Sequence, residues 1–439
     1  MKTDGKSFTD ARNTVSEVDR EIAALFEKRM KAVRVIAQYK SENGLPVFDG
    51  AREAELLGRN AGYILDPEIL PYYKKFAADT VEISKKYQRK LIGDTEKDGR
   101  MTLHVDTSGI GYDITVGRGC IDCAGDMLCG YKKVLVVTDS GVPAQYAQRV
   151  AATCSGAVTV TVEQGEQTKN PDTYVMLLKR MLAECFTRRD CVVAVGGGVV
   201  GDLSGFAAAS YMRGIDFYNI PTTLLSQLDS SIGGKTAVDL NGIKNSVGAF
   251  HAPRRVLIDP DLLATLPRRH VSNGLAEAIK MSLTSDPGLF EIFESGDISA
   301  RLEEIIIRSL RVKRYVVQED EKEQGLRRIL NFGHTLGHGI ESAEGCSGLL
   351  HGECVALGMI PMCSDSVRSR LIPVLEAAGL PTSYNGNADS VIEAVMHDKK
   401  AGADGITAVT VEAPGSFEFV RMDRSELSRR LELIPHGRA

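Results

Sequence analysis

Four side chains of the types that bind metal ions lie in three short segments of the second half of the sequence. Glu277 lies in NGLAEAIK, His334 and His338 lie in NFGHTLGH, and His351 begins HGE. The His-x-x-x-His spacing places both imidazoles on one face of a helix, but Thr335 replaces the glutamate that a zinc protease uses as its base. Two histidines and one carboxylate predict a zinc site open to a substrate oxygen. Any one of these histidines alone is also typical of a buried structural residue.

A glycine-rich loop follows a run of β-branched residues. Val192–Val195 leads into Gly196–Asp202, which reads GGGVVGD and contains G-x-G-x-x-G. Between a strand and a helix, the backbone N–H groups of such a loop bind a pyrophosphate. The acidic residue expected about 20 residues later falls in another predicted strand, and Asp139 is the better ribose partner. The loop therefore favours a dinucleotide site, with a tight structural turn as the alternative.

Basic residues lie in and beside the glycine-rich loops. Lys235 follows Gly233-Gly234 directly, and Lys244 lies a few residues further on. Lysines next to glycines in loops are typical of phosphate contacts rather than of a solvated helix face. We expect four further cations in the same pocket: Arg213, Lys280, Arg327 and Lys399.

A cation also interrupts an apolar stripe near the N-terminus. Arg29 stands where the repeat set by Val15 and Ile22 calls for a hydrophobic residue. A guanidinium in that stripe needs a carboxylate partner or an anionic ligand, and the pattern leaves both interpretations open. Ser84 and Gln88 are four residues apart and share one face of a later helix.

Three helices are predicted before residue 93. They cover Phe8–Asn43, Ala51–Asn60, and a third segment that opens at Asp66-Pro67 and runs to about Leu91. The first is about 50 Å long, more than the width of a small domain, so we expect it to pack against a partner chain as well. The polar segment Gly93–Arg100 predicts a linker.

Beyond the linker, short β-branched runs alternate with helical patterns. Strands are predicted at Lys133–Asp139, Val158–Val162 and Cys191–Val195, with a helix over Pro171–Cys185. This alternation indicates a parallel, doubly wound α/β sheet. The segments after about residue 266 are mostly helical: Gly274–Thr284, Ile298–Glu319, His334–Glu344 and Glu353–Arg370.

The predicted fold class is therefore multidomain, with an all-α domain, an α/β dinucleotide-binding domain and a mostly helical metal-binding domain. The expected boundaries are 1–92 for the all-α domain, 93–100 for the linker, 101–265 for the α/β domain and 266–439 for the helical one.

The polar residues of the N-terminal helices, taken together, resemble the active-site set of the all-helical, intertwined-dimer chorismate mutases. The resemblance covers residues 8–92 and rests on Arg12, Arg29, Lys40, Asp49, Arg52, Glu53, Ser84 and Gln88. Rearranging chorismate to prephenate needs no nucleophile, only a folded conformer and stabilisation of charge on the breaking ether oxygen.

The resemblance implies a role for each of these residues. Arg12, reaching across the dimer, and Arg29 hold the two carboxylates, with help from Arg52 and Ser84. Lys40 and Gln88 donate to the ether oxygen. Asp49 and Glu53 hold the region of the ring hydroxyl. The alternative is a regulatory module that binds chorismate or prephenate.

Residues 101–439 resemble 3-dehydroquinate synthase. The matching blocks are GGGVVGDLSGFAAASYMRG, IPTTLLSQLDSSIGGKTAVD, NGLAEAIK, EDEKEQGLRRILNFGHTLGH and HGE. The resemblance implies Zn²⁺, or Co²⁺ in its place, on Glu277, His334 and His351. It implies NAD contacts from Asp139, Glu166, Lys169, Gly198, Val199, Val200, Gly201, Asp202, Thr222, Thr223, Lys235, Lys244, Leu262 and Thr265. It implies substrate contacts from Arg213, Asp229, Lys235, Asn245, Lys280, Lys313, Arg327, Asn331, His338 and Lys399.

By this resemblance, a seven-carbon keto-sugar phosphate acid (DAHP) is converted to 3-dehydroquinate. NAD⁺ removes hydride and returns it, phosphate leaves between these steps, and the opened sugar closes by an aldol step. His338 relays protons. The rival interpretations are another sugar-phosphate cyclase and a polyol dehydrogenase, but a dehydrogenase has no need of a phosphate pocket rich in lysine and arginine.

Composition excludes several classes of protein. The formal charge is −5 without a basic excess in either half, so we expect no nucleic-acid partner. The sequence contains no apolar run long enough for a membrane span and no signal peptide pattern at its start. Nine scattered cysteines are typical of a protein whose thiols stay reduced, so we expect a cytoplasmic protein. We also expect it to be a homodimer that acts on small molecules.

Overall fold

The computed structural model describes residues 5–42, 50–107, 111–323, 325–345, 348–398 and 405–437. Two of the predicted site residues, Asp49 and Lys399, lie outside these ranges. The chain divides into two compact units, residues 1–98 and 99–439, and each is described by itself. Among the described residues, no helix is long and apolar enough to cross a membrane.

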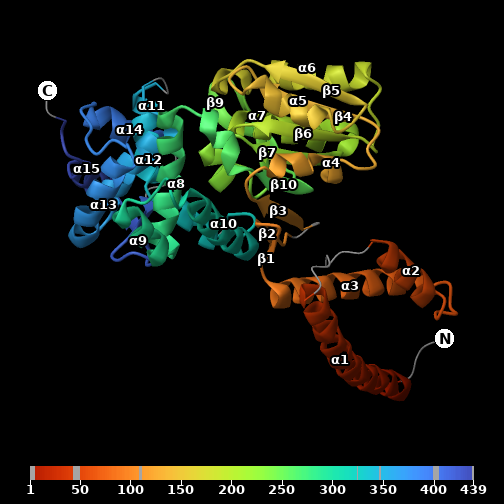
Figure 1. The fold of residues 1–439 in the computed structure, drawn as a ribbon. Helices are drawn as coiled ribbons and strands as arrows, with labels where there is room; N and C mark the ends of the chain where they lie inside the picture. The colour runs from red at the N-terminus through yellow and green to blue at the C-terminus, as the bar shows by residue number, and fades with distance from the viewer. Residues whose placement is uncertain are drawn as a thin grey trace. The chain divides into compact units, whose positions relative to one another are not determined.

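The described part of the first unit contains three helices, as predicted (Figure 1). They are α1 (Gly5–Glu42), α2 (Gly50–Ala61) and α3 (Leu70–Ile92). The third helix begins later than the sequence indicates, because the Asp66 carboxylate accepts from the Glu68 N–H in a turn and Pro71 then occupies the start of the helix. α1 packs on α3 through its second half, where Val33 and Ala37 are its buried apolar residues.

The segment expected as a linker contains a short strand, β1 (Thr95–Lys97), and the first residue of β2. The strands of the second unit's main sheet follow the order β2-β3-β10-β7-β6-β4-β5. Their bounds are β2 (Arg100–Val105), β3 (Tyr112–Val116), β4 (Val134–Asp139), β5 (Ala157–Val162), β6 (Cys191–Gly196), β7 (Asp216–Pro221) and β10 (Arg255–Ile258). β2 pairs with β3 antiparallel, and the other pairs are parallel.

Both faces of the parallel sheet are covered by helices, which explains why the central strands β4 and β6 are almost continuously apolar. On β4, Val134 and Val136 pack in one apolar cluster, whereas Leu135 and Val137 pack in another. The first cluster includes helices α4 (Ala124–Met127) and α5 (Ala144–Ala151), and the second includes α6 (Pro171–Ala183) and α7 (Gly198–Ser210). The predicted doubly wound sheet is confirmed.

A two-stranded hairpin, β8 (Lys235–Leu240) and β9 (Ile243–Phe250), precedes β10. The remainder is mostly helical and shares one apolar core. Its helices are α8 (Arg268–Ser285), α9 (Pro287–Ser295), α10 (Leu302–Glu319), α11 (His334–Ala343), α12 (His351–Met359), α13 (Asp365–Ala377), α14 (Ala388–Asp398) and α15 (Arg424–Leu431). It also contains an antiparallel pair, β11 (Ile406–Thr410) and β12 (Glu418–Met422).

The single helix predicted over Glu353–Arg370 is wrong. α12 ends at Met359, a short 3₁₀ turn covers Ile360–Met362, and α13 begins at Asp365 after Ser364 caps it by accepting from the Val367 N–H. Pro361 explains the break, because proline has no N–H to donate to the preceding turn of a helix.

Candidate active sites

The predicted cofactor residues gather at the carboxyl edge of the parallel sheet. Asp139 ends β4, Thr222 and Thr223 follow β7, and Glu166 follows β5. Leu262 and Thr265 lie in the 3₁₀ turn Pro260–Thr265 after β10. Since β6 pairs with β4 on the side away from β5, the strand order reverses between β4 and β6, which is where open α/β sheets bind ligands.

The glycine-rich loop forms the turn from β6 into α7 that the sequence predicts. A Cβ on Gly196 would lie 2.6 Å from the Val200 side chain, so the turn is tight enough to require glycine there. Gly198, Val199, Val200 and Gly201 form the first turn of α7. The first N–H groups of a helix have no partner within it and attract anions, so this turn is suited to a pyrophosphate.

A buried lysine links this turn to the hairpin. Lys169 is 4% exposed, and its Nζ lies 2.7 Å from an Asp202 oxygen and 3.5 Å from a Glu166 oxygen. It also donates to Asn245 on β9. Burial raises the pKa of Asp202 to about 6, although the charge of Lys169 acts in the opposite direction. Four predicted site residues therefore form one contiguous polar cluster.

A cavity of about 650 Å³ lies next to this cluster. Its walls come from α7, the β8–β9 hairpin, α8, α10, the turn Leu326–Asn331, α11 and α12. The predicted site residues that line it are Asp202, Asp229, Lys235, Asn245, Lys280, Lys313, Arg327, Asn331, His334, His338 and His351. Segments far apart in the sequence thus bring the predicted phosphate and metal residues into one space.

Each lysine of the cavity has an acidic partner. Lys280 pairs with Glu277, Lys313 with Asp229, and Lys235 with Glu323. Burial lowers the pKa of Lys313, and the Asp229 carboxylate opposes that shift. Burial would raise the pKa of Glu323, but its bond and charge interaction with Lys235 outweigh burial and lower it.

The three histidines of the cavity form a compact cluster. One nitrogen from each of His334, His338 and His351 lies within 4.8 Å of the others. Glu277 Oε1 lies 3.6 Å from His334 Nε2 and 3.7 Å from His351 Nε2. Ligands about 2.0–2.1 Å from a tetrahedral zinc ion are about 3.4 Å apart, so Glu277 and these two histidines are nearly at metal-binding spacing.

The electrostatics of the cluster also fit a divalent cation. Glu277 is 1% exposed, and its Oε1 has no hydrogen-bond donor in the described part of the chain. Burial would raise the pKa of Glu277, but Lys280 and the two imidazoles outweigh it and hold that pKa well below the usual value. Burial, followed by the charge of Lys280, holds the pKa of His334 well below its usual value, which keeps this imidazole neutral. An ionised carboxylate beside a neutral imidazole is a zinc-binding donor set.

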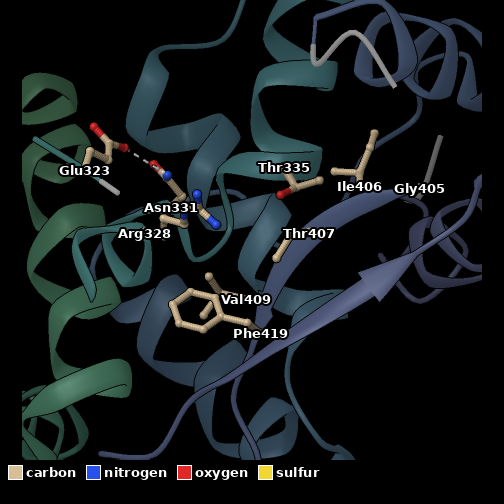
Figure 2. Close-up of a pocket in the computed structure, with 9 residues that line it drawn as sticks. All are labelled: Glu323, Arg328, Asn331, Thr335, Gly405, Ile406, Thr407, Val409 and Phe419. Carbon is tan, nitrogen blue, oxygen red and sulfur yellow. Dashed lines mark hydrogen bonds between the residues drawn. The ribbon is translucent and has the colours of Figure 1, made fainter. Parts of the chain in front are cut away.

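Glu323 is a cavity residue that the sequence analysis missed. Its carboxylate pairs with Lys235 and accepts from Asn331 Nδ2 at 3.2 Å, so it contacts two predicted substrate residues. Figure 2 shows it at the edge of a second cavity, of about 510 Å³, beside Arg328 and the β11–β12 pair. Its place four residues before Arg327 in the EDEKEQGLRR block does not by itself distinguish Glu323 from a solvated acid.

Other predicted residues do not line the larger cavity. Arg213 is exposed, has a positive φ of 71°, and lies in the turn after α7. Lys244 bonds Glu341 at 2.6 Å. The cofactor residues at the strand ends also lie outside its lining, as does Glu277, which is buried behind His334 and His351.

The first unit brings together part of its predicted site. Arg29 donates to Ser84 Oγ and, at 3.4 Å, to the Thr80 carbonyl. Gln88 is 8% exposed, and its Oε1 has no bonding partner among the described residues. Burial lowers the pKa of Arg29. Arg29, Ser84 and Gln88 thus form a half-buried polar group, and no carboxylate of the described residues bonds the guanidinium. This favours the anionic-ligand interpretation of Arg29.

Glu53 has a partner that the sequence analysis did not identify. Lys85 Nζ lies 3.1 Å from Glu53 and bonds Glu82, and Lys85 is 7% exposed. Arg52 lies 3.2 Å from Glu55 on the same helix, and Lys40 is half-buried near the end of α1. Arg12 lies over the Phe8 ring. It is 17 residues from Arg29, or about 26 Å along the helix, so the two guanidinium groups of one chain do not share a site.

Comparison with known proteins identifies a family for each unit. The family model for chorismate mutase type II matches residues 11–89. The models for the N-terminal and C-terminal parts of 3-dehydroquinate synthase match residues 159–273 and 274–401. A 3-dehydroquinate synthase of Caulobacter vibrioides (strain NA1000 / CB15N) is 42% identical, over 76% of this chain and 99% of the relative.

Two solved structures share the fold of the second unit. A 2-deoxy-scyllo-inosose synthase complexed with carbaglucose-6-phosphate, NAD⁺ and Co²⁺ has a TM-score of 0.70 and 26% identity, covering 75% of this chain and 99% of that one. A 2-epi-5-epi-valiolone synthase from Streptomyces hygroscopicus subsp. jinggangensis 5008, with NAD⁺ and Zn²⁺ bound, has a TM-score of 0.67 and 28% identity, covering 75% and 98%.

The second unit therefore has the fold of NAD- and metal-binding cyclases. The chain belongs to the 3-dehydroquinate synthase family and carries an N-terminal domain of the chorismate mutase type II family. The predicted fusion and the predicted fold class are confirmed.

Proposed function

We propose that the chain is a bifunctional enzyme of aromatic amino acid biosynthesis. One site converts DAHP to 3-dehydroquinate with release of phosphate, and the other rearranges chorismate to prephenate. The observation that carries the first assignment is the cavity in which Lys235, Arg327 and Asn331 lie beside the histidine cluster. The family membership of the chain supports the same reaction.

Each part of the cavity has a proposed task. Lys235, Asn245 and Arg327 bind the phosphate, because cations and amide donors in a cavity wall match its oxygens. Lys280 and Lys313 are buried and fixed by their acidic partners, so they orient the substrate's carboxylate and hydroxyl groups. His338 lines the cavity and moves protons between the substrate and solvent.

Glu277, His334 and His351 would hold Zn²⁺ or Co²⁺, and the carboxyl edge of the sheet would hold NAD. When bound, these groups supply a Lewis acid and a hydride acceptor that returns its hydride. The solved cyclases that bind NAD⁺ with Co²⁺ or Zn²⁺ support this choice of cofactors.

The assay that tests the synthase proposal uses DAHP with NAD⁺ far below the substrate concentration. We expect phosphate and 3-dehydroquinate to form over many turnovers without accumulation of NADH. Stoichiometric NADH would identify a polyol dehydrogenase instead. A different cyclic product would identify another sugar-phosphate cyclase.

In the first unit, Arg29, Ser84 and Gln88 carry the mutase proposal. They present donors to a dianion, and within the described part of the unit no carboxylate bonds Arg29 in competition. Chorismate consumption by the intact protein tests it. Saturable binding of chorismate without turnover would favour the regulatory module.

We further propose that the protein is a homodimer. Residues 7–28 of α1 are all exposed in the single chain, including Val15, Ile22 and Leu25, which are 60%, 44% and 64% exposed. An apolar stripe of this length is typical of a subunit interface. Light scattering at micromolar concentration should give a dimer. A monomer with full mutase activity would contradict an intertwined site.

The cytoplasm is the proposed compartment. Seven cysteines within the described ranges are free thiols, as expected for a protein kept under reducing conditions: Cys120, Cys123, Cys129, Cys154, Cys185, Cys191 and Cys363.

A further inference from the structure

Glu341, which has none of the predicted roles, lies between the β8–β9 hairpin and the mostly helical part of the second unit. Glu341 is on α11, seven residues after His334 and therefore on the same face of the helix. Its Oε2 lies 3.2 Å from His351 Nδ1, and its Oε1 lies 2.6 Å from Lys244 Nζ. Its side chain is 14% exposed. One carboxylate thus joins α12 of the helical half to β9 of the hairpin.

The two nitrogens of the His351 ring face different partners. Nε2 faces the Glu277 carboxylate within the histidine cluster, and Nδ1 faces Glu341. A proton held on Nδ1 by Glu341 leaves the lone pair of Nε2 directed at the cluster. Carboxylates in this position fix the tautomer and ring orientation of metal-binding histidines and increase their basicity.

We propose that Glu341 is a positioning residue that orients His351 for metal binding and anchors it, through Lys244, to the β8–β9 hairpin. This rests on the proposed function only in requiring that His351 bind a metal. The hairpin also carries Asn245, which bonds Lys169 in the cluster at the cofactor edge. Glu341 therefore connects the metal cluster to the side of the cavity where the dinucleotide is proposed to bind.

The test is the metal affinity of the full-length, metal-free protein, measured by competition with a chromophoric chelator, together with the visible absorption spectrum of the Co²⁺ form. E341A removes both contacts, and we expect zinc to bind about 10- to 100-fold more weakly. E341Q keeps a neutral acceptor for Nδ1, so its loss should be smaller. K244M keeps the His351 contact and should lose less affinity than E341A.

E344Q is the matched control. Glu344 caps the end of the same helix and accepts from the Tyr384 hydroxyl at 2.8 Å, so E344Q removes one negative charge without touching His351. We expect the zinc affinity and Co²⁺ spectrum of E344Q to match the wild type, and the spectrum of E341A to change. E341Q is nearly isosteric and serves if E341A folds poorly, as judged by circular dichroism.

Three results would overturn the proposal. Zinc affinity in E341A equal to that of the wild type would show that Glu341 does not position His351, while leaving the proposed function intact. An equal loss in E344Q and E341A would assign the effect to the charge of the helix rather than to the contact. A wild-type protein that binds no zinc would refute the metal assignment of the proposed function as well.

Discussion

Replacing Arg29 with alanine should abolish most of the mutase activity and leave the synthase activity unchanged. Arg29 donates to Ser84 and Thr80, and Ser84 keeps its own 2.8 Å bond to the Thr80 carbonyl without it. The structural loss is therefore about one or two hydrogen bonds, each worth about 0.5–1.5 kcal/mol. Removing a cation that pairs with a bound carboxylate costs about 2–5 kcal/mol, or about 30- to 5,000-fold in turnover.

Arg34 provides the matched control for this experiment. It lies on the same helix and also links α1 to α3, by donating to the Tyr87 hydroxyl at 2.7 Å, but this contact is exposed. R34A should keep mutase turnover within about threefold of wild type, since one exposed contact contributes little. Chorismate consumption and DAHP conversion are measured on each variant. Equal mutase activities in R29A and R34A would show that Arg29 only joins two helices.

Two further predictions concern the second unit. K169M should lower the free energy of unfolding by about 3–5 kcal/mol in a denaturant titration, because it removes the buried cation that pairs with the half-buried Asp202. K169M/D202N should recover most of this loss, and a double variant no more stable than K169M would contradict the pairing. Burial lowers the pKa of His351, but the nearby Glu277 carboxylate and the hydrogen bond to Glu341 outweigh burial and raise that pKa to about 9 in the metal-free chain. Zinc must replace this proton, so zinc affinity should rise about tenfold per pH unit between about pH 7 and pH 9, and an affinity independent of pH would refute this proton count.

The sequence predicts those parts of the fold in which local pattern and burial agree. β4 and β6 are apolar because both faces of the sheet are covered there, and β5 at the edge alternates valine with threonine. The predicted bounds of all three strands differ from the observed ones by at most one residue. The prediction of one helix over Glu353–Arg370 is wrong because here the local pattern and the backbone disagree. Its periodicity continues through Pro361, but the backbone breaks there because the proline cannot donate a hydrogen bond.

The sequence predicts which residue types form the site, but it does not predict which side chains pair with each other. Sequence alone indicates Glu277, His334 and His351, but not that Lys280 is the cation beside the buried Glu277. Glu323 and Glu341 resemble solvated acids in sequence, and their roles follow only from contacts with residues 88 and 97 positions away in the chain. Contacts over such separations depend on how the hairpin, α10 and α11 pack.

The central claim is that one chain carries two independent active sites, of which only one needs a metal. It is tested most directly by treating the intact protein with EDTA and measuring both reactions on the same sample. We predict that DAHP conversion is lost and returns on adding Zn²⁺ or Co²⁺, because Glu277, His334 and His351 lie together in the second unit. Chorismate consumption should continue at the untreated rate, since Arg29, Ser84 and Gln88 need no metal. Loss of both reactions with the fold retained, or retention of both after the metal is removed, would contradict the account.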